Sequence, residues 1–205
     1  MTLRSALLHP LAKPLVFVLC LLPLAWLVWG AATDQLGANP AEALIRGLGD
    51  WTLRFLCLAL AVTPLRLHTR TPQLARYRRM LGLFVFFYAC LHLLAYGWLD
   101  MGLQVADIGR DILKRPFILV GFACWLLLLP LALTSTNRAV RALGGRAWQT
   151  LHRLVYLVAG LALLHFFWMR SGKNDYAEVA LYAAIIGVLL LERLFRYLKP
   201  KRPPA

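Results

Sequence analysis

The chain has 205 residues, of which 60% are hydrophobic and 16% are charged, and its formal net charge is +14. Soluble domains average about half apolar and about a quarter charged residues, so this composition excludes an ordinary soluble domain. The four cysteines form no CxxC pair, which argues against a disulfide framework or a cysteine-based metal site.

The apolar residues are gathered in blocks of about 20 residues, the length that crosses the roughly 30 Å hydrocarbon layer as a helix. These blocks predict an all-α integral membrane protein, a six-transmembrane-helix bundle that forms a single domain over residues 1–205. In chain order the predicted spans are 14–33, 48–66, 80–99, 116–136, 149–169 and 177–195. The length of the first span favours a retained anchor over a cleaved signal peptide.

Charged residues outside the spans are distributed unevenly between the two sides of the predicted membrane. Lys and Arg gather on the side that holds both termini, the loop between spans two and three and the loop between spans four and five. Acidic residues other than Glu192 lie on the opposite side. The positive-inside rule therefore predicts that both termini are cytoplasmic. The positive charge then reflects membrane topology, and no nucleic-acid partner is needed to explain it.

Two of the histidines, His92 and His165, lie inside predicted spans at a similar depth. They come seven residues before Leu99 and five residues before Arg170, which is roughly 10 Å and roughly 7 Å below the outer ends of their helices. An ionisable residue within a span usually faces the bundle interior and is a functional candidate. The alternative is a histidine that is satisfied by a carbonyl or hydroxyl across the bundle. Because axial histidines commonly hold haem iron, we predict that the two imidazoles clamp an outer haem from both faces.

His152 lies about 20 Å nearer to the cytoplasm by the same helical rise. On span three the residue at that depth is Arg78, fourteen residues before His92 and on the same helix face. The inner level therefore has one histidine, and an arginine stands where a second histidine would complete a pair. We expect His152 to ligate a second or shared haem iron, with a histidine satisfied within the bundle as the alternative. His9 and His68 lie outside the spans and are expected to be solvated.

Three arginines are further candidates for cofactor contacts. Arg78 and Arg153, near the cytoplasmic mouth, would bind a haem propionate, a flavin phosphate or a quinone carbonyl, or would instead snorkel towards the lipid headgroups. Arg54 lies near the outer end of span two, at the depth of the outer histidine pair. It would bind a propionate there, or form an ion pair with Asp50 one helical turn earlier.

Four ordered segments carry a family resemblance. They are TLRFLCLALAVTPLR (52–66), RRMLGLFVFFYACLH (78–92), KRPFILVGFACWLLLLPLALTS (114–135) and WQTLHRLVYLVAGLALLHFFW (148–168). Together they resemble the MsrQ (YedZ) family of haem-binding membrane subunits, over about residues 45–198, and more distantly the ferric-reductase-like transmembrane domain of NADPH oxidases. The resemblance implies one or two b-type haems, with the histidine ligands of the family falling on His92, His152 and His165.

The resemblance also implies a function in electron transfer, as a subunit of the bacterial inner membrane that is not itself the catalytic one. A cytoplasmic flavin reductase or the quinone pool would supply electrons. A periplasmic MsrP-like molybdenum-cofactor enzyme, which reduces methionine sulfoxide during the repair of oxidised proteins, would accept them. FMN is an implied cofactor without assigned residues, and quinone is a further candidate. NADPH oxidases hold two haems with two histidines on each of two helices, and this chain departs from that pattern at Arg78.

Two other functions stay open on the sequence. The first is a quinol-linked cytochrome b or ferric reductase, which would not need a periplasmic acceptor protein for turnover. The second is a small transporter or assembly factor that uses intramembrane histidines for proton relay. The absence of broken half-helices and of repeat symmetry argues against the second. A purified protein without a haem spectrum would favour it.

Overall fold

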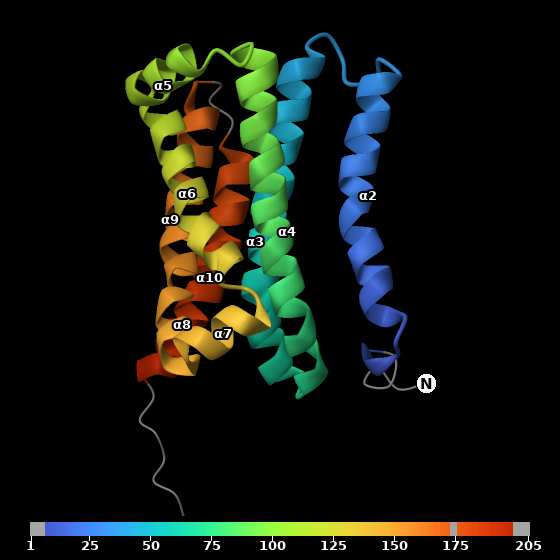
Figure 1. Ribbon diagram of the computed structural model, residues 1–205, viewed down its shortest axis with the longest axis vertical. Coiled ribbons are helices and arrows are strands. Elements are labelled where there is room, and N and C mark those ends of the chain that lie inside the picture. The colour runs from blue at the N-terminus through green and yellow to red at the C-terminus, as the bar shows by residue number, and fades with distance from the viewer. Residues whose placement is uncertain (1–6, 173–175, 199–205) are drawn as a thin grey trace, which may run out of the picture.

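The computed structural model describes residues 7–172 and 176–198, and these residues form a bundle of helices (Figure 1). Five segments are long and apolar enough to cross a membrane. They are α2 (Ala12–Ala32), α3 (Pro40–His68), α4 (Ala75–Ala95) with the flanking turns η1 (Pro72–Leu74) and η2 (Tyr96–Asp100), α6 (Pro116–Leu133), and α8 (Gly145–Leu151) followed by α9 (Leu154–Ser171). The predicted all-α membrane fold is confirmed.

The sixth predicted span corresponds to α10 (Ala177–Leu198). This helix packs against α9 and α3, and it ends at the same end of the bundle at which α2 begins (Figure 1). It is not among the five segments that are long and apolar enough to cross a membrane, and its charged residues lie near its two ends; they are Glu178, Glu192, Arg193 and Arg196. A sixth crossing, and with it the cytoplasmic location of both termini, stays a prediction.

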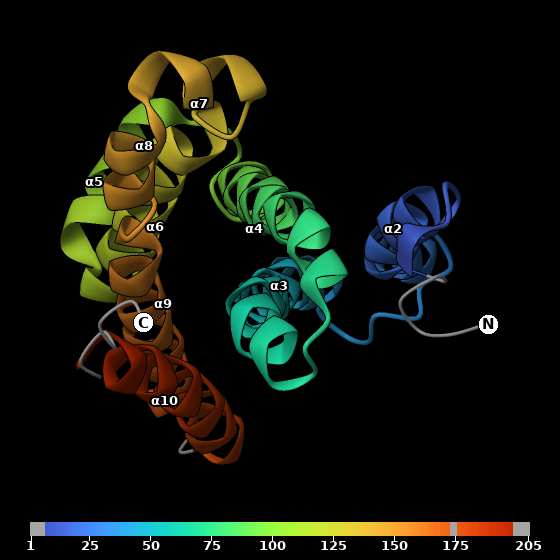
Figure 2. The same cartoon turned by 90° about the horizontal axis from the view of Figure 1, so that it is seen from below.

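The two helices that carry the outer histidine pair each lie along a partner helix. α3 packs along α4, and α6 packs along α9. Seen along the bundle, α3 and α4 lie together, and α6, α8, α9 and α10 form an arc opposite them (Figure 2). α2 lies on the outer side of the first pair (Figure 2). Contacts between α4 and α6 join the two halves.

Tyr88 on α4 ties α2 to the core. Its side chain is 0% exposed, and its hydroxyl donates to the Cys20 carbonyl at 2.8 Å and accepts from the Leu24 amide at 3.1 Å. These two backbone groups lie one turn apart in α2. Because an unpaired hydroxyl in apolar surroundings is costly, both bonds are needed to keep a tyrosine at this position. The ring of Phe55 on α3 packs against Tyr88, with centroids 5.0 Å apart.

α3 begins well before the predicted start of span 48–66 because its N-terminus is capped. The side chain of Asn39 accepts a hydrogen bond from the Glu42 amide at 3.1 Å, and Pro40 occupies the first helical position. Both are features that favour the start of a helix. The added residues include Ile45, whose carbonyl matters for the functional site.

The fifth predicted span, 149–169, is not one continuous helix, since α8 and α9 are separated by a turn at His152 and Arg153. The amides of Arg153 and Val155 each bond a carbonyl three residues back. A tightened turn of this kind interrupts the regular α-helical ladder and changes the direction of the side chains on either side. His152 and His165 therefore do not lie on one straight helix.

Two short helices lie outside the predicted spans, α5 (Val105–Lys114) and α7 (Asn137–Leu143). α5 is fixed at its end by Tyr96, whose hydroxyl donates to the Asp111 carboxylate at 2.6 Å, and by an ion pair of Asp111 with Arg115. The hydrogen bond from Arg115 holds the pKa of Asp111 below its usual value. Neither helix has an apolar run of membrane-spanning length, which is why the spans alone did not predict them.

Reporter fusions test the side on which α10 ends. We expect a fluorescent protein fused to the C-terminus of the full chain to be fluorescent, and alkaline phosphatase fused after Leu103 to be active. Phosphatase needs disulfides that form only outside the cytoplasm, so its activity reports an outer location. An active phosphatase at the C-terminus, with no fluorescence there, would contradict the six-span topology.

Candidate functional site

The two histidines predicted to form the outer pair lie close together. His92 projects from α4 and His165 from α9, and their ring centroids are 6.3 Å apart with 75° between the ring planes. Both side chains are half-buried. The depth match expected from their positions on parallel spans thus corresponds to a direct approach of the two rings.

Each imidazole is held by a carbonyl of the partner helix. His92 Nδ1 lies 2.9 Å from the Ile45 carbonyl oxygen on α3, and His165 Nδ1 lies 2.6 Å from the Phe117 carbonyl oxygen on α6. A carbonyl oxygen has no hydrogen to donate, so Nδ1 carries the proton in both rings. The remaining nitrogen, Nε2, is then left with a free lone pair. Metal-ligating histidines commonly have this arrangement, in which the second ring nitrogen donates to a carbonyl.

The spacing of the rings fits a shared metal ion. If both imidazoles bind one metal ion from opposite sides, each nitrogen–metal bond is about 2 Å long. Adding the radii of the two rings gives a distance of about 6 Å between the ring centroids. The observed 6.3 Å agrees with that value. Two imidazoles supply only the axial ligands of an iron ion, so this geometry suits a metal whose equatorial ligands come from a macrocycle such as haem.

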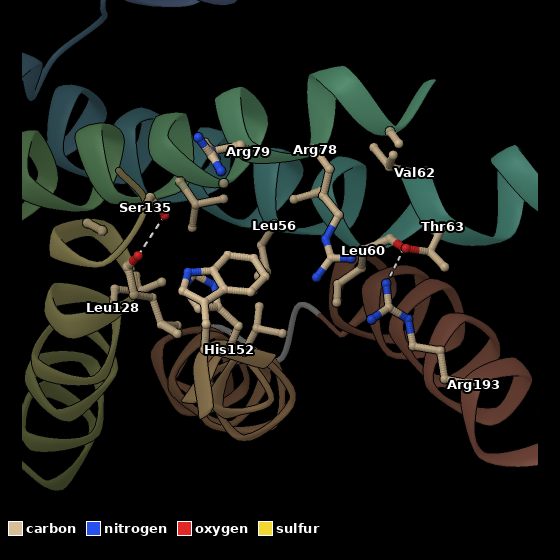
Figure 3. Close-up of a pocket in the computed structure, with 18 of the residues that line it drawn as sticks. Leu56, Leu60, Val62, Thr63, Arg78, Arg79, Leu128, Ser135, His152 and Arg193 are labelled. Atoms are coloured by element: carbon tan, nitrogen blue, oxygen red, sulfur yellow. Dashed lines mark hydrogen bonds between the residues drawn. The ribbon is translucent and has the colours of Figure 1, made fainter. Parts of the chain in front are cut away.

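A second site is a cavity of about 270 Å³ at the opposite end of the bundle. It lies between α3 and α4 on one side and α6, α8, α9 and α10 on the other (Figure 3). His152 and Arg78 both point into it (Figure 3). The cavity therefore brings together the histidine and the arginine that were predicted to share the inner level.

His152 is held within this cavity by two contacts. Its ring stacks on Trp148 with centroids 3.9 Å apart and 28° between the planes, and its Nε2 lies 3.1 Å from the hydroxyl of Thr134, the residue that follows α6. The tight turn after α8 gives the ring this direction. A metal at Nε2 would have to displace the Thr134 hydrogen bond, which distinguishes His152 from the outer pair.

The inner cavity is strongly basic. Arg66, Arg78, Arg79 and Arg193 line it, and none of the described residues that line it is acidic. Arg193 donates to the Leu60 carbonyl at 2.7 Å and to the Tyr156 hydroxyl at 2.7 Å. The lining therefore suits an anionic group such as a carboxylate or phosphate.

Similarity to known proteins agrees with this geometry. A family model described as a ferric reductase like transmembrane component matches residues 47–163. A curated relative from Polaromonas naphthalenivorans (strain CJ2), named protein-methionine-sulfoxide reductase heme-binding subunit MsrQ, is 66% identical over 93% of this chain and 87% of its own length. The chain belongs to the MsrQ family. Relatives with the same name from Herminiimonas arsenicoxydans and Xanthomonas euvesicatoria pv. vesicatoria are 52% and 48% identical, over 90% and 95% of this chain and 85% and 90% of their own lengths.

Membership of the MsrQ family confirms the resemblance seen in the four sequence segments, and the ferric-reductase match confirms the predicted type of transmembrane domain. That match covers His92 and His152 but ends at residue 163, just before His165. The pairing of His165 with His92 in this MsrQ-family chain therefore rests on the geometry of the two rings.

The other two predicted arginines lie apart from the inner cavity. Arg54 on α3 donates its Nε–H to the Tyr182 hydroxyl on α10 at 3.1 Å, and its guanidinium lies 4.7 Å from the centre of the Trp51 ring. Arg153 is exposed at the turn between α8 and α9 and is not among the residues that line the cavity. Their contacts to a cofactor stay predictions.

Several residues of both sites were missed by reasoning from the sequence. Trp148 lies four residues before His152, a spacing that predicts contact on a helix, and could have been found by that signal. Arg193 lies at the basic end of the last predicted span, where the positive-inside pattern alone accounts for an arginine. Gly49 and Gly121 lie against the outer histidines, and no signal in a single sequence distinguishes them from other helical glycines.

Proposed function

We propose that this chain is a haem b electron-transfer subunit of the inner membrane, which passes electrons to a periplasmic MsrP-like molybdenum-cofactor methionine sulfoxide reductase. The names of its relatives describe haem-binding subunits of a protein-methionine-sulfoxide reductase. The observation that carries the proposal is the His92–His165 pair, in which two imidazole rings lie 6.3 Å apart, a spacing that suits ligation of one metal by both. The chain itself would carry electrons rather than perform the reduction of the substrate.

His92 and His165 would hold the iron of the outer haem. When bound, this group supplies a carrier for one electron at a time, with a potential that the axial ligands and burial adjust. The residues of the chain fix the orientation of the two Nε2 atoms through the carbonyls of Ile45 and Phe117. This pair of histidines lies at the end of the bundle that the charge distribution predicts to be periplasmic. A soluble acceptor would dock at that end.

The basic cavity around His152 would receive electrons from the cytoplasmic side. A second or shared haem with His152 as ligand is the first candidate occupant, and Arg78 would bind a propionate of that haem. FMN and a quinone are the other candidates, since a phosphate or a carbonyl oxygen also suits the arginines that line the cavity. The donor would be a cytoplasmic flavin reductase or the quinone pool.

A quinol-linked cytochrome b or ferric reductase is the alternative, which the match to the ferric reductase like family favours. The two functions differ in the acceptor. We expect rapid reoxidation of the reduced, purified protein by its periplasmic acceptor protein, because the proposed role needs a protein partner. Stopped-flow absorbance measures this rate. Equally fast reoxidation by ferric chelates alone, with no acceleration by the acceptor protein, would favour the alternative.

The ligand assignment is tested by His92→Ala and His165→Ala. Each variant should lose the outer haem. Removing a hydrogen-bond partner of a metal ligand typically lowers the metal affinity by roughly 10- to 100-fold, and removing the ligand itself should lower that affinity further. Pyridine haemochrome quantification per polypeptide measures the remaining haem. His68→Ala is the matched control, since His68 contacts Glu192 outside both sites. Full haem content in both ligand variants would defeat the assignment.

The inner site is tested by Arg78→His. Arg78 lines the same cavity as His152 from the opposite helix, so a histidine there would complete a pair of imidazoles. We expect the haem content per polypeptide to increase. Arg76→His serves as the control, because Arg76 lies on the same helix, donates to the Leu7 carbonyl and is not among the residues that line the cavity. No gain in Arg78→His over this control would contradict the idea that Arg78 replaces a second ligand.

A further inference from the structure

The two hydrogen bonds that hold the outer histidines have the same construction on two different helices. His92 bonds the carbonyl of Ile45, and the residue four positions later is Gly49. His165 bonds the carbonyl of Phe117, and the residue four positions later is Gly121. In an α-helix the carbonyl of a residue points towards the residue four positions later. The Cα–Cβ bond of that later residue leans back towards the N-terminus and so over the carbonyl.

A side chain at either glycine would meet the imidazole ring. A Cβ atom at Gly121 would lie 2.8 Å from His165 Cε1, 2.9 Å from Nδ1 and 3.2 Å from Nε2. A Cβ atom at Gly49 would lie 3.1 Å from His92 Cε1, 3.2 Å from Nδ1 and 3.7 Å from Nε2. In both cases the nearest atoms belong to the ring itself. The first thing to move on substitution is therefore the ring.

We propose that Gly49 and Gly121 are positioning residues for the outer haem ligands. Their missing side chains let each ring approach the partner helix closely enough to donate Nδ1–H to a helical carbonyl, which directs Nε2 towards the shared metal. The inference rests on the proposed ligation by His92 and His165. It adds to that proposal the residues that set the direction of the ligands.

Ordinary helix packing does not account for these two positions. Gly47, two residues before Gly49 on α3, would place its Cβ 2.7 Å from Leu27 Cδ2 and so serves contact between α3 and α2. Gly160 on α9 has no atom within 4 Å of a Cβ. Among the glycines that the structure describes, those whose added Cβ meets a histidine ring are Gly49 and Gly121.

The construction predicts a graded effect. Alanine at position 121 would displace its ring further than alanine at position 49, because its Cβ lies closer to all three ring atoms. A displaced ring loses its carbonyl partner, and loss of such a partner typically costs about 10- to 100-fold in metal affinity. The imidazole also becomes a weaker donor to the metal, so the midpoint potential of the outer haem should rise.

The experiment compares Gly121→Ala and Gly49→Ala with two controls, Gly47→Ala and Gly160→Ala, in the full chain purified with its haem. Three quantities are measured: the midpoint potential of the outer haem, the anisotropy of its low-spin ferric EPR signal, and the haem content. The EPR anisotropy reports the orientations of the imidazole rings. We expect the midpoint potential and the EPR anisotropy to change in Gly121→Ala, to change less in Gly49→Ala and to stay unaltered in the controls. Gly47→Ala should lower the melting temperature without altering the haem signals.

The outcomes separate this inference from the proposed function. If the unaltered protein shows a bis-imidazole signal that His92→Ala and His165→Ala abolish, ligation holds. Unchanged potentials and EPR signals in both glycine variants would then overturn the positioning role alone. If Gly121→Ala fails to fold, as judged by size-exclusion chromatography, Gly49→Ala decides, and a signal identical to that of Gly47→Ala overturns the inference. A chain without any low-spin haem signal would instead contradict the proposed function.

Discussion

A neutral imidazole inside a membrane bundle carries an N–H group that lipid cannot satisfy, and this constraint organises the centre of the structure. His92 and His165 meet it by donating to carbonyls on neighbouring helices. The same two bonds fix which nitrogen of each ring is free, and they join α4 to α3 and α9 to α6. Ligand orientation and helix pairing are thus two consequences of a single interaction, made once in each half of the bundle.

The two ends of the bundle differ in the charge of the side chains that they gather. The outer pair has neutral rings that suit a metal in apolar surroundings. The inner cavity instead gathers guanidinium groups with no acidic residue among the described residues that line it. Such groups need an anionic partner or water to be stable near a membrane. The outer level therefore suits a metal, and the inner level suits a group that brings negative charge.

The sequence predicted the features that depend on composition and helical rise. Apolar length placed the spans, and counting residues from the span ends placed His92 and His165 at one level. The turn at His152 was not predicted. The hydrogen bonds around it, between His152 and the Thr134 hydroxyl and from Trp148 Nε1–H to the Thr134 carbonyl, form only when α6 and α8 meet. The early start of α3 was missed although Asn39 and Pro40 form a recognisable capping pattern, because hydropathy dominated the choice of boundary. Gly49 and Gly121 gain meaning only from the rings placed against them.

The connections between the two halves differ along the bundle axis. At the outer level each histidine is bonded within its own half. The distance between the two rings is therefore set by how the halves pack, through α4 against α6 and α3 against α10. A metal held by both rings would bridge the halves. At the inner level His152 contacts Trp148 and Thr134, both in its own half. There the halves are linked by arginines, through Arg193 with the Leu60 carbonyl and Arg79 with Asn137. A group that binds both halves at once stabilises the closed bundle by linkage. A metal on the outer pair would supply that stabilisation. The inner arginines already join the halves, and the cavity between them would be accessible to an exchangeable anionic partner.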